Sequence, residues 1–286
     1  MKLILLLFTA LIVKCASAQV SLNFTFETPY GSNEKTGKYV ELNGNTIYYE
    51  EYGSGDPLLL IHGNGGDISW MGNQIDFFKK NYRVIVADNR GHGKSGLKTD
   101  SLTYVQIAKD WQALAKHLQL ESPSIIGWSD GGIIALLMGI NNEIKLKKII
   151  SMAANLRPDS SAIHPFVVDY VKTQREAVEK MLIAKDETQN WNTLKQHLIL
   201  LGEQPNISNA DLSKIDAEVL VIAGDEDIIK GKHSLEIYQG IQKAQLCIIP
   251  GATHFAPASS PKIFNEIVQR FLIEDFKRPD SDFTKW

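Results

Sequence analysis

The sequence predicts an α/β protein with a mostly parallel, doubly wound sheet and a small helical cap. Strand-like apolar runs alternate with stretches of helical periodicity over residues 37–154 and 212–273, a pattern typical of a sheet covered by helices on both faces. The alternation is interrupted once, over residues 155–211, where the periodicity is helical. Glycine-rich turns carrying polar side chains follow several of the apolar runs. Because the carboxyl ends of parallel strands share one edge of a sheet, these turns are expected to meet there.

The individual elements follow from this pattern. Tyr39–Leu42 and Thr46–Glu51 flank the turn Asn43-Gly44-Asn45 and are predicted to form a hairpin at the sheet edge. The alternating core elements that follow are expected at Leu58–Ile61, 67–79 (helix), Val84–Ala87, 103–118 (helix), Ser124–Ile126, Ile133–Ile140 (helix), Lys147–Ser151, Glu218–Ala223 and Gln245–Ile249.

Residues 155–211 are predicted to form the helical cap. Their apolar positions recur at helical spacing, at Val167, Val168, Tyr170, Val171, Ala177, Met181, Leu182, Leu194, Leu198 and Leu201. Most of these side chains are expected to pack the cap onto the core. A cap in this place would roof a pocket, exclude water and set specificity.

Gly127-Trp128-Ser129-Asp130-Gly131 has the G-x-S-x-G pattern of a nucleophile elbow. Glycines on both sides allow a sharp turn from strand to helix, which exposes the Ser129 hydroxyl. The pattern is short, and its support comes from its setting, since a strand-like run precedes it and a helix-compatible run follows. Ser129 is therefore the predicted nucleophile.

A serine hydroxyl is a weak nucleophile at its free pKa, so the elbow implies a histidine base and an acid that orients it. Both are expected downstream, the acid first. Asp227 follows the run Glu218–Ala223, and His254 follows the run Gln245–Ile249. Asp225 is a competing acid in the same turn. Taken singly, Asp227 could be a solvated turn residue and His254 a loop histidine.

A glycine-rich turn, His62-Gly63-Asn64-Gly65-Gly66, follows the predicted strand Leu58–Ile61. Such a turn can aim a backbone N–H at the active site. We therefore assign the oxyanion hole to the backbone amides of Asn64 and Asp130, with a plain tight turn as the alternative.

These features resemble the α/β-hydrolase superfamily over about residues 38–273. Asp88–Ser95 matches the D-x-R-G-x-G-x-S signature of the esterase-like branch, which is structural in that family, so His92 and Ser95 are not expected to be catalytic. The elbow is similar to that of the biphenyl hydrolase-like, valacyclovirase-type enzymes. The resemblance implies cleavage of amino-acid esters, with an acidic residue near the serine, here Asp130, receiving the substrate ammonium. Trp128 is a further candidate substrate-binding residue. The alternative for Asp130 is a favourable position at the positive end of a helix dipole.

The N-terminus is typical of a secretory signal peptide. Lys2 precedes a short apolar core, and Ala16-Ser17-Ala18 forms a small-residue cleavage site before Gln19. The apolar core is too short to span a membrane. Residues 1–18 are predicted to be removed, giving a secreted or periplasmic protein. Lipid attachment at Cys15 is the disfavoured alternative, because Lys14 precedes the cysteine.

The rest of the composition excludes several classes of function. After cleavage Cys247 would be the sole thiol, so no internal disulfide is expected. A net charge of −3 gives no basic footprint for nucleic acid, and the seven histidines lack metal-ligand spacing. No cofactor or metal is expected. The core is predicted to be flanked by a loose leader at 19–36 and a charged tail at 274–286. The sequence does not indicate an oligomeric state.

The sequence thus predicts a secreted serine hydrolase that cleaves a small carboxylic ester through an acyl-enzyme. C–C bond hydrolysis or perhydrolysis on the same triad is the first alternative. An alternative of another class is a catalytically quiet protein that binds a ligand on this fold.

Overall fold

The computed structural model describes residues 25–279 and 281–285. The predicted signal peptide, Cys15 and the first part of the leader lie outside the described residues. No helix within the described ranges has both the length and the apolar character needed to cross a membrane.

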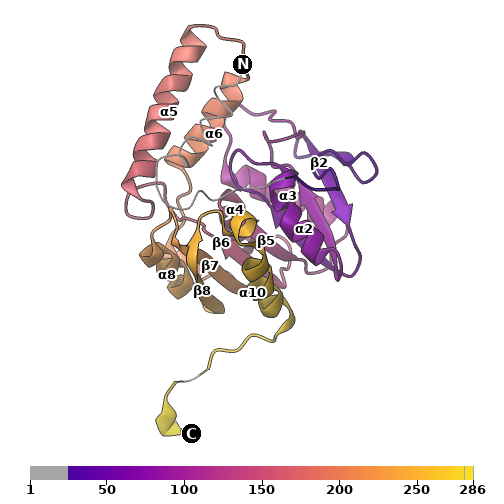
Figure 1. Ribbon diagram of the computed structural model, residues 1–286, viewed down its shortest axis with the longest axis vertical. Coiled ribbons are helices and arrows are strands. Elements are labelled where there is room, and N and C mark those ends of the chain that lie inside the picture. The colour runs from indigo at the N-terminus through magenta and orange to yellow at the C-terminus, as the bar shows by residue number, and fades with distance from the viewer. Residues whose placement is uncertain (1–24, 280, 286) are drawn as a thin grey trace.

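A single eight-stranded sheet forms the centre of the molecule, in the order β1-β2-β4-β3-β5-β6-β7-β8 (Figure 1). The β1–β2 hairpin pairs antiparallel to β4, and every later pairing is parallel. The mostly parallel sheet and its edge hairpin are therefore confirmed. The strands are β1 (Lys38–Leu42), β2 (Asn45–Tyr52), β3 (Asp56–Ile61), β4 (Tyr82–Ala87), β5 (Ser124–Trp128), β6 (Lys148–Met152), β7 (Glu218–Glu226) and β8 (Ala244–Thr253).

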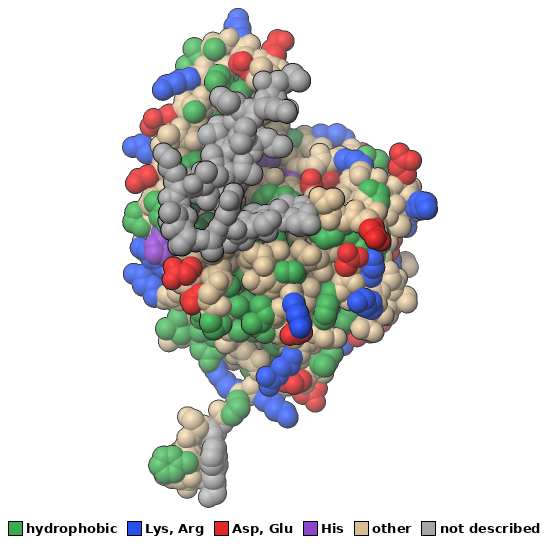
Figure 2. Space-filling model, in the orientation of Figure 1, with side chains coloured by type: hydrophobic (Ala, Val, Ile, Leu, Met, Phe, Trp, Pro, Cys, Tyr) green, Lys and Arg blue, Asp and Glu red, His purple; other side chains and the backbone are tan. Residues whose placement is uncertain are grey.

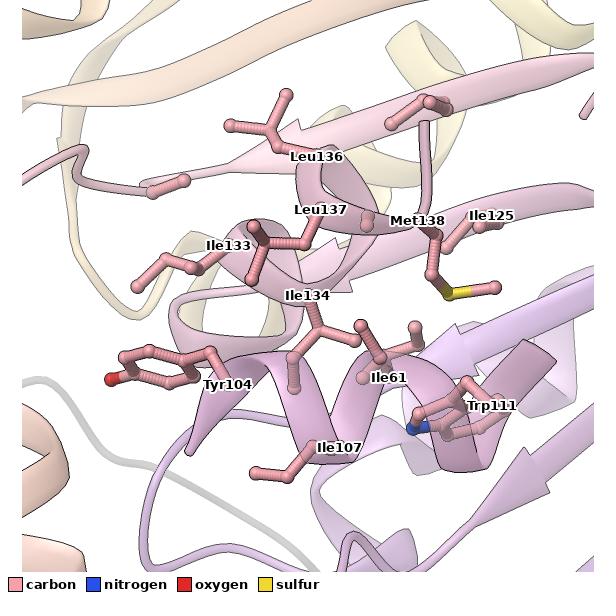
Figure 3. Close-up of a cluster of buried hydrophobic side chains, with 14 of the residues drawn as sticks. Ile61, Tyr104, Ile107, Trp111, Ile125, Ile133, Ile134, Leu136, Leu137 and Met138 are labelled. Carbon is pink, nitrogen blue, oxygen red and sulfur yellow. The ribbon is translucent and has the colours of Figure 1, made fainter. Parts of the chain in front are cut away.

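Helices cover both faces of the sheet, as a doubly wound fold requires. They are η1 (Ile68–Met71), α2 (Gly72–Phe78), α3 (Tyr104–His117), α4 (Asp130–Asn141), α8 (Gly231–Gly240), α9 (Ala256–Ser259) and α10 (Pro261–Ile273). Alternate strand residues point to opposite faces. Thus Ile125 packs with α3 and α4, whereas Ile126 packs in the cluster that contains α2 and α10. Figure 3 shows part of the first cluster, in which Ile107 and Trp111 of α3 lie near Ile134 of α4.

The segment between β6 and β7 is helical, with α5 (Pro165–Ile183), α6 (Trp191–Glu203) and the short α7 (Asn209–Leu212). Helices α5 and α6 pack side by side and project from the sheet (Figure 1). They share a small apolar cluster, made by Val171, Val178, Trp191 and Leu198. Helix α7 instead adds Leu212 to the core. Most of the apolar cap residues therefore pack the two cap helices against each other, whereas the sequence predicted that they pack the cap onto the core.

The predicted loose leader is wrong for residues 28–36. Tyr30 is 5% exposed, and its hydroxyl donates to Asp76. The backbone N–H groups of Gly31 and Asn33 each donate to the buried Glu50 carboxylate over 3.0 Å. A buried acid on β2 therefore fixes this segment, which sequence polarity alone does not reveal.

Charged side chains of both signs are interspersed on the face shown in Figure 2. Among the described residues visible on this face, basic side chains do not gather into a patch, in keeping with the net charge of −3. The polypeptide leaves the body after α10 and ends its described part in η2 (Phe283–Lys285).

Candidate active site

Ser129 lies at the junction of β5 and α4, in the strained conformation of a sharp turn. Its φ is 59° and its ψ is −117°, which non-glycine residues rarely adopt. Backbone packs tightly around this turn. A Cβ at Gly127 would lie 2.0 Å from the carbonyl oxygen of Gly131, and one at Gly131 would lie 2.0 Å from that of Ile61. Both motif glycines are therefore required by close backbone approach.

The structure brings Ser129, His254 and Asp227 together from three places in the chain. His254 follows β8 and Asp227 follows β7, and both strands run parallel to β5. The Ser129 Oγ lies 2.9 Å from His254 Nε2, and His254 Nδ1 lies 2.8 Å from Asp227 Oδ1. This is the hydrogen-bonded order of a serine, a base and an orienting acid.

The surroundings of His254 favour one arrangement of its protons. Asp227 is 6% exposed, and its carboxylate also accepts the backbone N–H of Ile229 over 3.0 Å. A carboxylate accepts only, so His254 Nδ1–H donates to it. The lone pair of Nε2 is then free to accept the Ser129 hydroxyl proton.

Asp225, the competing acid, points elsewhere. It is exposed, and its Oδ1 accepts the backbone N–H of Ala252 over 3.2 Å. The geometry thus favours Asp227 as the partner of His254.

The prediction that Trp128 contacts substrate is wrong in this structure. Trp128 is 1% exposed, and its only polar side-chain atom, Nε1, donates to the carbonyl oxygen of His254 over 2.7 Å. Its ring packs against those of Trp70 and Phe255. Because side chains alternate along β5, Trp128 points into the apolar cluster that contains α2 and α10. There it supports the loop that carries His254.

The two residues predicted to supply the oxyanion donors both lie close to Ser129. Asp130 is the first residue of α4, where a backbone N–H has no acceptor within the helix. The turn that holds Asn64 lies directly against Ser129, because a Cβ at Gly63 would be 3.0 Å from the Ser129 Cβ. The structure therefore brings both amides to the neighbourhood of the serine.

The Asp130 side chain is buried, at 3% exposure. It accepts a hydrogen bond from Asn64 Nδ2 over 2.9 Å and another from the Tyr104 hydroxyl. Burial raises its pKa from 3.8 to about 6, against the opposing effect of these two hydrogen bonds and of the nearby His254. None of the ion pairs found among the described residues includes Asp130. It is thus a desolvated carboxylate with neutral partners, and it also occupies the helix position that the alternative interpretation expects.

Two residues near the site were not predicted from the sequence. Tyr104 begins α3 and reaches Asp130, while His197 of α6 places its carbonyl oxygen 3.5 Å from Asn64 Nδ2. His197 stands out as a polar residue among Leu194, Leu198 and Leu201, which could have marked it. No local signal distinguishes Tyr104 from a core tyrosine.

The remaining predicted motif residues support the turns. His62 is fully buried, and its Nδ1–H donates to the carbonyl of Gly63 while its Nε2 accepts the Asn89 N–H. Burial lowers its pKa to about 4, so it stays neutral in this role. Ser95 Oγ donates to the carbonyl of Asp88 over 2.7 Å. The described residues hold no group of three acidic, histidine or cysteine side chains suited to a metal ion.

Comparison with known families places this geometry in context. A family model described as the alpha/beta hydrolase fold matches residues 56–197. The human protein named "Serine hydrolase BPHL" is 25% identical over 260 residues, covering 85% of this chain and 88% of its own. The 2-hydroxy-6-oxo-6-phenylhexa-2,4-dienoate hydrolase of Comamonas testosteroni is 26% identical over 282 residues, covering 86% and 98%.

Solved structures agree on the fold. The enol-lactonase of Burkholderia xenovorans superposes with a TM-score of 0.69 at 20% identity, covering 83% of this chain and all of its own. The bromoperoxidase of Bacillus anthracis gives a TM-score of 0.70 at 22% identity, covering 84% and 100%. The predicted α/β-hydrolase fold is confirmed, and the similar proteins named here are enzymes.

Proposed function

Since the chain belongs to the α/β-hydrolase superfamily, we propose that it hydrolyses small carboxylic esters through an acyl-enzyme on Ser129. One observation carries the proposal. The Ser129 Oγ, the His254 ring and the Asp227 carboxylate form one continuous hydrogen-bonded series, with heavy-atom distances of 2.9 and 2.8 Å. These distances lie within the range needed for proton transfer between a nucleophile and its base.

The mechanism follows from the donors and acceptors of this series. His254 Nε2 takes the hydroxyl proton as Ser129 Oγ attacks the ester carbonyl. Asp227 accepts from Nδ1–H and stabilises the imidazolium that forms. The carbonyl oxygen becomes an oxyanion, which the backbone N–H groups of Asn64 and Asp130 bind.

Collapse of this intermediate breaks the bond to the leaving alcohol, which takes the proton from His254. A water molecule then gives its proton to His254 Nε2 and attacks the acyl group on Ser129. The second tetrahedral intermediate releases the carboxylic acid and restores the serine. No step requires a group other than the substrate and water.

Covalent labelling with a fluorophosphonate, together with turnover of aryl esters of varied acyl length, tests the proposal. The purified mature protein should be labelled at Ser129 and should release the phenol. Ser129→Ala should abolish labelling and lower turnover by about 10³-fold or more, with an unchanged fold. A folded protein that neither labels nor turns over any ester would support the quiet ligand-binding alternative instead.

The same screen addresses the other reactions open to this triad. One similar protein is named as a 2-hydroxy-6-oxo-6-phenylhexa-2,4-dienoate hydrolase and another as a bromoperoxidase. A vinylogous diketone substrate and a peroxide acceptor therefore belong in the panel. Faster turnover of either than of every ester would replace ester hydrolysis as the main activity.

A substrate with an α-amino group on the acyl side is our finer proposal. The Asp130 carboxylate is desolvated, is paired with neutral groups, and directly follows Ser129 in the chain. An ammonium group would compensate this buried charge. The similarity to the serine hydrolase BPHL agrees with the resemblance seen in the elbow sequence.

The comparison of amino-acid aryl esters with their deaminated analogues tests this substrate class. In the wild type, kcat/KM should be higher for the amino-acid esters, and Asp130→Asn should remove most of this preference. Equal loss on both ester types would leave Asp130 without a role in selecting cations.

We further propose that the protein acts outside the cytoplasm after cleavage between Ala18 and Gln19. The charged start, the short apolar core and the small residues before Gln19 support this location.

A further inference from the structure

We propose that Asp130 and Tyr104 are positioning residues for the oxyanion hole, acting through the side-chain amide of Asn64. The inference rests on the proposed ester hydrolysis, because it concerns how that site holds its oxyanion donors. The proposal gives a role to the side chains of Asn64 and Asp130, whose backbone amides are the proposed oxyanion donors. It gives a further role to Tyr104, which contacts the Asp130 side chain.

The side chain of Asn64 has the geometry of an anchor. Asn64 is 8% exposed, so its amide is largely removed from water. One Nδ2–H donates to Asp130 Oδ2 over 2.9 Å, and the second lies 3.5 Å from the carbonyl oxygen of His197. Within the turn itself, the backbone bond from Gly66 N to Gly63 O spans 3.2 Å, and neither this bond nor that of His62 Nδ1 to Gly63 O involves Asn64. The side chain therefore ties this turn to two other elements.

The two oxyanion donors are thereby linked to each other. Asn64 and Asp130 carry the two proposed backbone donors, and their side chains share a hydrogen bond. A bond to an ionised acceptor is stronger than a neutral one, particularly away from water. Tyr104 donates to the same carboxylate and limits its rotation. The spacing of the donors is thus set before substrate binds, which is the condition for efficient oxyanion stabilisation.

The cap takes part in the same arrangement. His197 belongs to α6, and its ring stacks on that of His92 at a centroid distance of 4.0 Å. Its Nε2–H donates to the carbonyl of Gly91 over 3.0 Å. The carbonyl that faces Asn64 is therefore held by a docked part of the cap, and Asn64 contacts the core and the cap together.

Four variants separate positioning from plain packing, assayed on an aryl acetate that carries no amino group. Asn64→Ala keeps the backbone donor and removes the anchor, and should lower kcat by about tenfold or more with little change in KM. Asp130→Leu should have a similar effect. Asp130→Asn retains an oxygen that accepts from Asn64, and should lose much less than Asp130→Leu. Tyr104→Phe should lower kcat by a smaller factor of about threefold to tenfold.

Tyr48→Phe is the matched control. Tyr48 is 3% exposed, and its hydroxyl donates to the buried Glu50 carboxylate over 2.7 Å. The substitution removes the same kind of bond away from the triad, and kcat should stay at the wild-type value. A tetrahedral boronic acid inhibitor provides a second readout, since its inhibition constant should rise in proportion to the loss of kcat.

The proposal would be overturned by wild-type kcat in Asn64→Ala and Tyr104→Phe, or by a rise in KM with kcat unchanged. If Asp130→Leu does not fold, the kcat values of Asn64→Ala, Tyr104→Phe and Asp130→Asn still test the positioning role. Absence of fluorophosphonate labelling in the wild type would instead reject the proposed function, so the two failures are distinguishable.

Discussion

Asp130→Asn should stabilise the folded protein at alkaline pH, because the native state keeps a carboxylate away from water. The pKa of Asp130 is raised from 3.8 to about 6 by burial. Since each pKa unit corresponds to about 1.4 kcal/mol, the ionised form costs the folded state about 3 kcal/mol. Asparagine has nearly the same shape, can still accept from Asn64 and carries no charge.

The sign of the pH dependence follows from the two pKa values. Between pH 3.8 and about 6, the folded protein holds a proton on Asp130 that the unfolded chain has lost. The Asp130 contribution to stability therefore falls as the pH rises through this window and is constant above it. The gain from Asp130→Asn should be about 3 kcal/mol at pH 8 and below about 1 kcal/mol at pH 4.

Urea unfolding of both proteins at pH 8 and pH 4 measures this difference, and other titrating groups cancel in the comparison. Thermal unfolding at pH 8 should show a rise of about 6–10 °C. Asp169→Asn, at an exposed position on α5, is the control and should change stability by less than about 0.5 kcal/mol at either pH. A gain of equal size at both pH values, or a loss at pH 8, would refute the reasoning.

Three further predictions concern the triad, its support and the N-terminus. Asp227→Asn should lower kcat by about 10⁴-fold through the wrong histidine tautomer, whereas Asp225→Asn should be mild; kinetics showing the reverse order would reassign the acid. Trp128→Phe removes the bond to the His254 carbonyl and should destabilise the fold by about 1–3 kcal/mol, measured by urea unfolding; no change would deny Trp128 its supporting role. Mass spectrometry of the processed protein should find Gln19 at the N-terminus, and a lipid adduct on Cys15 would contradict this.

The sequence predicted those features that depend on local pattern. Strand positions followed from apolar runs, and Ser129, Asp227 and His254 were located because each follows such a run in a glycine-containing turn. Parallel pairing then required these turns to share an edge, and the structure has them within hydrogen-bonding distance.

What the sequence did not predict depends on contacts between distant segments. Residues 28–36 of the leader are fixed by Glu50, whose burial on β2 has no local signature. Trp128 was misjudged because adjacency to Ser129 in sequence does not mean adjacency to substrate. Residues that alternate along a strand face opposite ways, so Trp128 faces the layer beneath the site.

Asp130 shows why such errors gather around an active site. The buried Asp130 carboxylate is in none of the ion pairs among the described residues, against the general rule that buried charges are paired, and its raised pKa gives the size of the cost. Ser129 breaks a second rule with its positive φ. The buried carboxylate and the strained backbone thus belong to two adjacent residues, Asp130 and Ser129. A carboxylate that is expensive to bury, yet fixes Asn64 beside the nucleophile, is best explained by what it does for the reaction. Ser129 and Asp130 therefore depart from the usual backbone and burial preferences at the place where the proposed reaction needs a fixed geometry.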